Sequence, residues 1–325
     1  MATGQSLGKP LAHHTEAVFA TACTVLGGVP VAVSGSRDGT VRMWDMETGT
    51  PVGEPLAGLG SVTSLACTQA RETPLAVVGG RAAGVWDLST RRKLLKLADD
   101  YPAFAVACAM AGDRPIAVTC KKTRWEPYLG DSILQLWDLA ALRAVGEPLV
   151  VPSDSANNMA CTAVGGHVVA IATGMRATIQ LWHPTDGQLL SELPAVDTLV
   201  TLACAVLDGT PIALSGGQSG IVRIWDLAAR QLMGPPLIVH SGPVRSIECA
   251  VLDGKSVAVT TSKDQTVHLW DLRERATITT LTVDAPRTAT ITDSGELIIG
   301  FHNDIALLRR LPGSAKSTAL THIQW

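Results

Sequence analysis

The sequence predicts an all-β protein built from repeats, and three observations lead to this prediction. A Trp-Asp or Trp-His pair ends a short apolar stretch six times, at Trp44, Trp86, Trp137, Trp182, Trp225 and Trp270. Consecutive tryptophans of this set are 42, 51, 45, 43 and 45 residues apart, which is a near-constant period. Between them, short apolar strands alternate with glycine-containing turns. Four short strands in roughly 43 residues are typical of one blade of a β-propeller.

Each repeat has the same internal order. An alternating apolar strand comes first, as in residues 18–25 (VFATACTV), and a Gly-Gly or Asp-Gly turn follows, where glycine permits a positive φ. A second strand comes next, as in 30–36 (PVAVSGS), and a third strand ends at the tryptophan, as in 39–45 (GTVRMWD). The fourth segment often ends in Gly-x-Pro-Leu, as in residues 53–56.

First strands can be found near residues 18, 62, 103, 158, 199, 244 and 286, so we expect seven blades of four antiparallel strands in one domain. The expected repeats span residues 15–57, 58–98, 99–150, 151–193, 194–238, 239–281 and 282–312. The seventh repeat carries Leu308 in place of tryptophan and has no obvious fourth strand.

The N-terminus offers a replacement for that strand. Residues 7–14 (LGKPLAHH) match residues 234–241 (GPPLIVHS) in position and chemistry, so residues 1–14 are expected to close the ring as the outer strand of the last blade. Closure of this kind hides a sheet edge that would otherwise invite aggregation. The C-terminal tail, residues 313–325, is a second candidate for the same strand.

Composition limits the kinds of function. Hydrophobic residues make up 46% and charged residues 17%, which indicates an ordered chain. A net charge of −3 predicts no attraction to nucleic acid or to an anionic membrane. Since no apolar run could span a bilayer and the N-terminus lacks an apolar signal core, we expect a cytoplasmic protein. We also expect a monomer.

Six of the seven cysteines share one position in the repeat, namely Cys23, Cys67, Cys108, Cys161, Cys204 and Cys249, each preceded by Ala or Glu. The chain contains no C-x-x-C pair, and these cysteines lie in successive repeats. We therefore expect small buried thiols that pack like apolar side chains, with no metal site and no cofactor. Free thiols also suit a reducing compartment.

With these repeats, the chain resembles the WD-repeat β-propeller family over nearly its whole length. The run LDG-x-P-x-A-x-S-G resembles propellers common in actinomycete bacteria. The resemblance implies a hydrogen-bonded His, Ser/Thr, Asp and Trp set in a blade. Two repeats match it fully, with His14, Ser34, Asp38 and Trp44 in one and His240, Thr260, Asp264 and Trp270 in the other.

Two repeats depart from this set. The fifth keeps Ser215 and Trp225 but has Ser219 at the Asp position, and the fourth has Ala172 and Arg176 at the hydroxyl and Asp positions. A catalytic triad would be another interpretation of His, Ser and Asp together. The recurrence of the set beside a tryptophan in a second blade favours a structural role instead.

No catalytic motif was found, so surface residues remain as candidates. The resemblance implies partner binding on the face built from the loops before each first strand and between the second and third strands. In the third repeat the latter loop is long (residues 120–132, CKKTRWEPYLGDS), and such loops often bind partners. The alternative is that its aromatic residues only pack the loop onto the disc. The candidate partner-binding residues are Arg37, Tyr101, Lys121, Lys122, Arg124, Trp125, Tyr128, Arg176 and Lys263.

The sequence therefore favours a non-catalytic scaffold that binds a protein or peptide, and the basic bias suggests an acidic partner. The alternative is a small-molecule site or an active site at the mouth of the central channel. Polar residues near the starts of first strands are few, namely Asp197, Asn157, Asn158 and Arg245, to which His302 and Arg176 could add. This set is small for catalysis.

Overall fold

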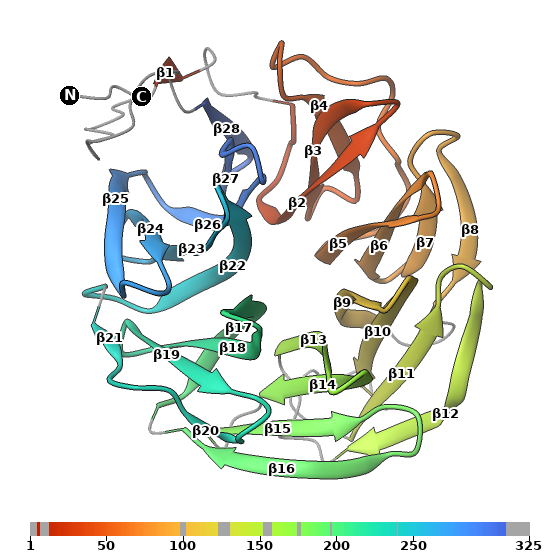
Figure 1. The fold of residues 1–325 in the computed structure, drawn as a ribbon. Helices are drawn as coiled ribbons and strands as arrows, with labels where there is room; N and C mark the ends of the chain where they lie inside the picture. The colour runs from red at the N-terminus through yellow and green to blue at the C-terminus, as the bar shows by residue number, and fades with distance from the viewer. Residues whose placement is uncertain are drawn as a thin grey trace.

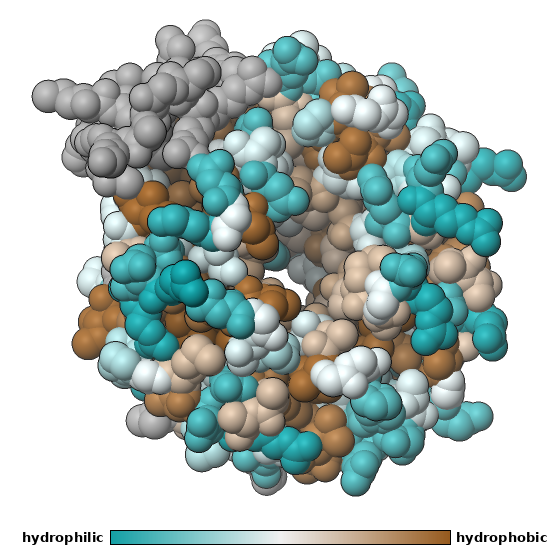
Figure 2. Space-filling view, viewed as in Figure 1, coloured by the Kyte–Doolittle hydropathy of each residue, from teal (hydrophilic) through white to brown (hydrophobic). Residues whose placement is uncertain are grey.

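The computed structural model describes residues 5–6, 13–97, 102–122, 131–151, 158–173, 177–195, 197–238 and 240–309. Regular secondary structure within these ranges consists only of β-strands, which confirms the predicted all-β class. The sheets stand side by side around a central opening (Figure 1), and the space-filling view looks through that opening (Figure 2). No helix capable of crossing a bilayer occurs in the described part of the chain.

The strands recur in a fixed order from the centre outward. The inner strands are β2 (Val18–Leu26), β5 (Val62–Ala70), β9 (Ala103–Ala111), β13 (Asn158–Val164), β17 (Leu199–Leu207), β22 (Val244–Leu252) and β26 (Pro286–Ile291). The second strands are β3 (Val29–Ser36), β6 (Thr73–Gly80), β10 (Arg114–Lys122), β14 (His167–Thr173), β18 (Thr210–Gly217), β23 (Lys255–Ser262) and β27 (Leu297–Phe301). The third strands are β4 (Val41–Asp45), β7 (Gly84–Asp87), β11 (Ser132–Asp138), β15 (Thr178–His183), β19 (Ile221–Asp226), β24 (Thr266–Asp271) and β28 (Asp304–Arg309). The outer strands are β8 (Arg92–Lys96), β12 (Arg143–Val151), β16 (Gln188–Pro194), β20 (Gln231–Leu232), β21 (Leu237–Ile238), β25 (Ala276–Thr282) and β1 (Gln5–Ser6).

Backbone pairing agrees only partly with separate four-stranded blades. The strands form six sheets, one of them eight-stranded because Gly80 of β6 pairs with Ala103 of β9. The sheet of β2, β3 and β4 has three strands, and only the isolated bridges Val41–Leu56 and Trp44–Pro51 stand where a fourth was expected.

Prolines lie in the interrupted outer strands. The segment beyond β4 contains Pro51 and Pro55, and that between β20 and β21 contains Pro235 and Pro236. Proline has no backbone N–H to donate to the neighbouring strand and so weakens the ladder, although β12 stays continuous across Pro148.

The N-terminal segment joins the last sheet, where β1 pairs with β28 in antiparallel register, Gln5 with Arg309. The expected match at residues 7–14 lies largely outside the described residues, as does the tail at 313–325. First and last sheets also meet where the inner strand β2 begins, because the Val18 amide donates to the carbonyl of His302, in the turn after β27, at 2.8 Å.

Neighbouring sheets pack through glycine. A Cβ placed on Gly35 would lie 2.5 Å from Val62 of the next sheet, and one on Gly216 would lie 2.7 Å from Val244. Only a residue without a side chain permits this approach. The same contact recurs between the last and first sheets, where a Cβ placed on Gly300 would lie 2.8 Å from Val18.

Candidate functional site

Four side chains of the first sheet form a continuous hydrogen-bonded chain. The indole Nε1 of Trp44 donates to Ser34 Oγ at 2.9 Å, so the Ser34 hydroxyl hydrogen is left to point at His14 Nε2, also at 2.9 Å. The other ring nitrogen of His14 lies 2.9 Å from Asp38 Oδ2. Burial lowers the pKa of His14, although Asp38 counteracts the effect, which favours a neutral ring that donates from Nδ1.

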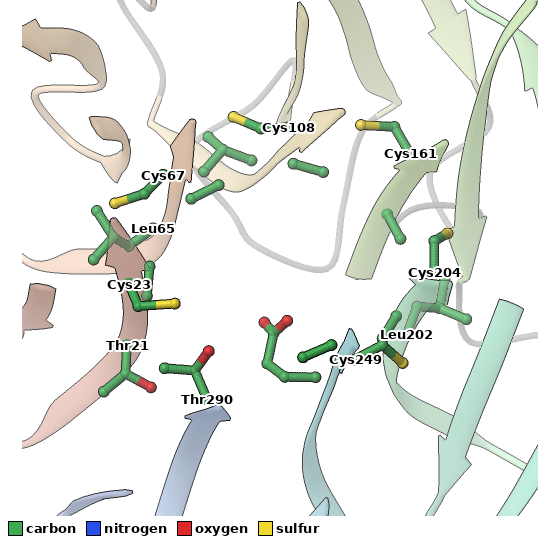
Figure 3. Close-up of a pocket in the computed structure, with 18 of the residues that line it drawn as sticks. Thr21, Cys23, Leu65, Cys67, Cys108, Cys161, Leu202, Cys204, Cys249 and Thr290 are labelled. Carbon is green, nitrogen blue, oxygen red and sulfur yellow. The ribbon is translucent and has the colours of Figure 1, made fainter. Parts of the chain in front are cut away.

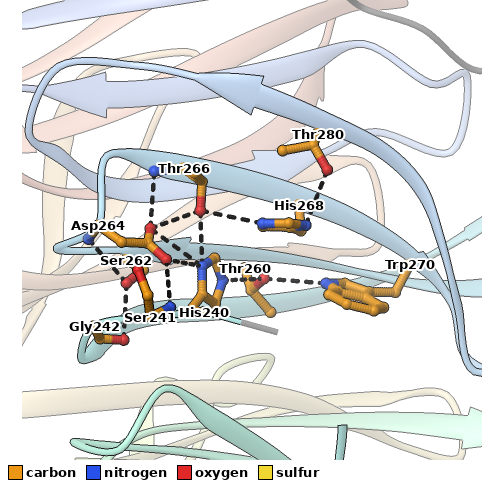
Figure 4. A network of polar contacts seen from close by, with 10 residues as sticks. All are labelled: His240, Ser241, Gly242, Thr260, Ser262, Asp264, Thr266, His268, Trp270 and Thr280. Atoms are coloured by element: carbon orange, nitrogen blue, oxygen red, sulfur yellow. Dashed lines mark hydrogen bonds and ion pairs between the residues drawn. The ribbon is translucent and has the colours of Figure 1, made fainter. Parts of the chain in front are cut away.

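The sixth repeat builds the same arrangement (Figure 4). His240 Nε2 lies 2.9 Å from Thr260 Oγ1, and Trp270 donates to the same oxygen at 3.1 Å. Asp264 lies 3.1 Å from His240 Nδ1. Burial alone would raise the pKa of Asp264, but hydrogen bonds from Thr266 and the Ser241 amide outweigh it and hold that pKa below its usual value.

This geometry leaves no nucleophile. Ser34 is fully buried, and its hydroxyl oxygen already accepts from Trp44 while its hydrogen serves His14. An attacking hydroxyl must reach a substrate and lie beside oxyanion donors. The two networks therefore hold the third strand and the turn that follows the second strand, and perform no chemistry.

In the other repeats, the indole N–H of the tryptophan is hydrogen-bonded where the second strand supplies a hydroxyl. Trp137 donates to Thr119 at 3.0 Å, and Trp225 donates to Ser215 at 2.8 Å. In the second and fourth repeats, by contrast, Trp86 Nε1 and Trp182 Nε1 are buried without a hydrogen-bond partner.

The fifth repeat uses a substitute for the missing Asp of the turn. Ser219, which stands at that position, donates from both its amide and its hydroxyl to Asp197, which precedes β17. In this repeat the carboxylate comes from the segment before the inner strand, and the turn supplies the donors. Asp197 and Asn158, which binds the Val200 carbonyl at 3.1 Å, are both engaged in holding the backbone.

The structure places Arg37 and Lys263 at equivalent exposed turns. The Arg37 amide donates to the Ala17 carbonyl at 2.9 Å, and the Lys263 amide donates to the Pro243 carbonyl at 3.0 Å, so each turn is fastened to the segment before an inner strand. The Arg37 side chain is 65% exposed and pairs with Glu16 at 3.4 Å. We call the side of the molecule where the inner strands begin the start face.

Most of the long third-repeat loop lies outside the described residues. Cys120, Lys121 and Lys122 continue β10, and Lys121, which pairs with Ala103, is half-buried. The remaining predicted residues lie outside the described residues, namely Tyr101, Arg124, Trp125, Tyr128 and Arg176. The side chain of Lys122 is also outside them.

Two arginines form a feature that sequence reasoning did not assemble. Arg245 and Arg287 each occupy the β-bulge at the start of an inner strand, in β22 and β26. The Nε atoms of both are buried without a hydrogen-bond partner. Burial, and next the charge of Arg287, lower the pKa of Arg245. The Arg287 guanidinium also lies 5.2 Å from the ring centre of Phe19, the bulge residue of β2.

The signal for this pair was present in the sequence. Arginine is the second residue of both inner strands, in VRS at 244–246 and PRT at 286–288. Arg245 and Arg287 hold equivalent positions in successive repeats.

The centre of the ring holds a cavity of about 380 Å³, lined by inner-strand residues (Figure 3). Six cysteines surround it, namely Cys23, Cys67, Cys108, Cys161, Cys204 and Cys249. Each pairs with an alanine of the second strand, which in turn pairs with the repeat tryptophan, as Cys23 does with Ala32 and Trp44. Burial raises the pKa of every one of these thiols, to about 11 for Cys23 and about 12 for Cys161. They are therefore protonated and weakly nucleophilic at neutral pH. The expectation of buried thiols holds for Cys161, but the other five are partly exposed because they face the cavity.

Metal binding receives no support from the lining. Among the described residues, no three His, Cys, Asp or Glu side chains converge in a way that could hold a metal ion. All seven cysteines are free thiols.

Comparisons with known proteins agree with the fold. The family described as WD domain, G-beta repeat matches residues 4–45 and 235–271, the two segments that carry the complete networks. Autophagy-related protein 16 of Arabidopsis thaliana is 26% identical over 173 residues, which is 52% of this chain and 31% of that protein, so the chain spans about a third of this relative. The crystal structure of the WD40 β-propeller domain of Doa1 aligns with a TM-score of 0.72 at 16% identity, covering 98% of this chain and 100% of that one. The chain is therefore a β-propeller, two segments of which match the WD repeat.

Proposed function

We propose that this protein is a non-catalytic scaffold that binds an acidic protein or peptide segment on the start face. The pair Arg245 and Arg287 carries the proposal. Two guanidiniums lie close enough for one to lower the pKa of the other, and each leaves a buried Nε without an acceptor. Arginine is the preferred residue for bidentate recognition of carboxylates.

The unfavourable energy of placing these two guanidinium groups side by side supports a ligand of opposite charge. A buried donor without an acceptor is unfavourable, and like charges side by side add to that penalty. A carboxylate from a partner would relieve both effects. Phe19, which is 37% exposed, would supply an apolar contact beside the bound acid.

Other features of the start face are consistent with this proposal. Lys263 adds positive charge at an exposed turn of the sixth repeat, while the equivalent Arg37 of the first repeat pairs with Glu16. In general, propellers with WD repeats act as protein-interaction scaffolds, and a preformed surface loses little entropy on binding. The proposal includes Trp125 and Tyr128 of the third-repeat loop as further anchors.

We further propose that the ring counts seven blades and is closed by the N-terminal strand. Dividing the eight-stranded sheet at its single Gly80–Ala103 pair would yield the expected repeats. The β1–β28 pairing and the contact of Gly300 with Val18 support closure. A monomer in the cytoplasm, of the type found in actinomycete bacteria, completes this proposal.

The test is co-purification with the full chain as bait, followed by titration of the captured protein against purified variants. The double variant Arg245→Gln/Arg287→Gln should lose a protein that wild type retains. Arg114→Gln is the matched control, because Arg114 begins β10 in the turn that follows the inner strand β9 and is exposed. Retention of the same proteins by all three baits would refute the face assignment.

A further inference from the structure

One register position lines the channel in all the inner strands. It is alanine in five of them and threonine in one, namely Ala22, Ala66, Ala107, Ala160, Ala203 and Thr290. The seventh occupant is Glu248, which pairs with Val259 as Ala22 pairs with Val33. A long acid thus stands where the repeat otherwise requires a small side chain.

Glu248 has no described partner for its charge. The Glu248 side chain is exposed to the water of the channel, so the inner strands around it desolvate it only in part. No hydrogen bond or ion pair joins it to another described residue, and no Lys, Arg or His lines the cavity. Burial alone raises the pKa of Glu248 to about 7.

A second acid extends the negative character of the cavity. Asp293, which follows β26, also lines the channel, and Glu248 and Asp293 both raise the pKa of the Cys23 thiol through their charge. Asp293 lies three residues beyond Thr290, the equivalent of Glu248, in the turn that follows β26, so the two acids lie at different depths along the channel.

The remaining walls are suited to methylene groups. Alanine methyls and protonated thiols line most of the cavity, whose volume of about 380 Å³ is within the range of small-molecule sites. A divalent metal would need several ligands, and no such group occurs among the described residues. A flexible chain with separated ammonium groups matches both the walls and the spacing of the acids.

We propose that the central channel binds a linear aliphatic polyamine, with one ammonium group paired with Glu248 and a second near Asp293. The bound ammonium group serves as the counter-ion of the Glu248 carboxylate, which has no partner among the described residues. Alkyl segments between the ammonium groups cover the alanine and cysteine side chains. This site is independent of the start face, since it uses none of the arginines there.

The pH dependence follows from the groups that face Glu248. These are Cys23 from β2, Cys204 from β17, Cys249 from β22 itself and Asp293 from beyond β26. The thiols stay protonated below pH 9, because burial raises the pKa of each. Glu248 is therefore the lining group whose ionisation changes near pH 7, and affinity should rise between pH 6 and pH 8.

The experiment is calorimetric titration of spermidine into the full chain at pH 6 and pH 8, with wild type, Glu248→Ala, Glu248→Gln and Asp293→Asn. Glu248→Ala restores the residue found at this position in five other inner strands, so it should fold. We expect one site in wild type, at least a tenfold loss of affinity in both Glu248 variants, and a smaller loss in Asp293→Asn. Arg114→Gln should bind as wild type does.

Three results would overturn the proposal. They are no binding to wild type at pH 8, equal affinity in Glu248→Ala, and equal affinity at the two pH values. Thermal melting of each variant without spermidine establishes that it is folded. Binding lost in a folded Glu248→Gln variant, which keeps the shape of the side chain, supports the charge pairing.

Discussion

The indole Nε1 of Trp182 is buried without an acceptor among the described residues, because Ala172 stands where the equivalent residue of the first sheet is Ser34. Ala172 pairs with Gln180 of β15, as Ser34 pairs with Arg42 of β4, so the two positions correspond. One missing oxygen thus leaves a donor unsatisfied within a regular strand arrangement, at a cost of about 1–3 kcal/mol.

The first prediction restores that oxygen. Ala172→Ser should raise the free energy of unfolding by about 1 kcal/mol, because the new hydroxyl accepts from Trp182. Urea denaturation followed by tryptophan fluorescence measures the change. Ala170→Ser, at a fully buried position of the same strand, is the control and should destabilise the protein. A stabilisation of equal size in both variants would contradict the assignment.

The second prediction removes a hydroxyl that is already used. Thr260→Val keeps the shape of the side chain but takes the acceptor from Trp270 and the partner from His240. Because both groups are buried, unfolding should become easier by about 1–3 kcal/mol. The same measurement on Thr260→Ser, which retains the oxygen, should show a smaller change. Equal losses in the two variants would mean that packing matters more than the hydrogen bonds.

The third prediction concerns pH in the absence of any amine. The pKa of Glu248 is about 7 in the folded chain and near its usual value of 4.5 when unfolded, so the folded state holds the proton more strongly. Its contribution to stability is present below about pH 4.5 and is lost as the pH rises to 7. Channel solvent screens the carboxylate, so we discount the full linkage value to about 1–2 kcal/mol.

Glu248→Ala isolates this contribution. Its stability should exceed that of wild type at pH 8 and approach wild type at pH 5, as measured by denaturation at both values. The difference between the two proteins is informative because the buried histidines, whose titration also changes stability in this range, are common to both. A difference that does not vary with pH would contradict the raised pKa.

The fourth prediction tests packing between sheets. Gly216→Ala should destabilise the protein by about 1–3 kcal/mol, because the new methyl group would lie 2.7 Å from Val244 Cγ1. Val244→Ala removes that methyl and should recover part of the loss in the double variant. A double-mutant cycle by urea denaturation gives the coupling between the two positions. Additive effects would show that the two side chains do not meet.

Much of the fold could be predicted from the sequence because equivalent packing positions of successive repeats carry similar residue types. The spacing of 21 residues from Cys23 to Trp44 recurs in four of the six repeats that carry both residues, since both lie in one row across the sheet, together with Ala32. Close packing of that row favours the same residue types in these repeats. The complete networks were predictable for a similar reason, since a buried His, hydroxyl, Asp and Trp satisfy one another at fixed separations.

Other features depend on contacts that no local pattern encodes. The Gly80–Ala103 pair that joins two sheets is a single backbone contact between neighbours. The proximity of Arg245 to Arg287 arises because adjacent inner strands bring equivalent bulges together across more than forty residues. Asp197 could replace the turn acid of the fifth repeat only because it approaches Ser219 from another segment.

The cysteine positions have a practical consequence for probing the central channel. Each of these thiols belongs to a different inner strand, and all but Cys161 are partly exposed while the ring is intact. A small alkylating reagent will therefore reach the five exposed thiols through the channel, whereas a reagent too large to enter will label them only when a strand opens. Mass spectrometry of the labelled peptides would compare the two reagents separately at each strand. The ring thus carries its own internal probes of what its channel admits.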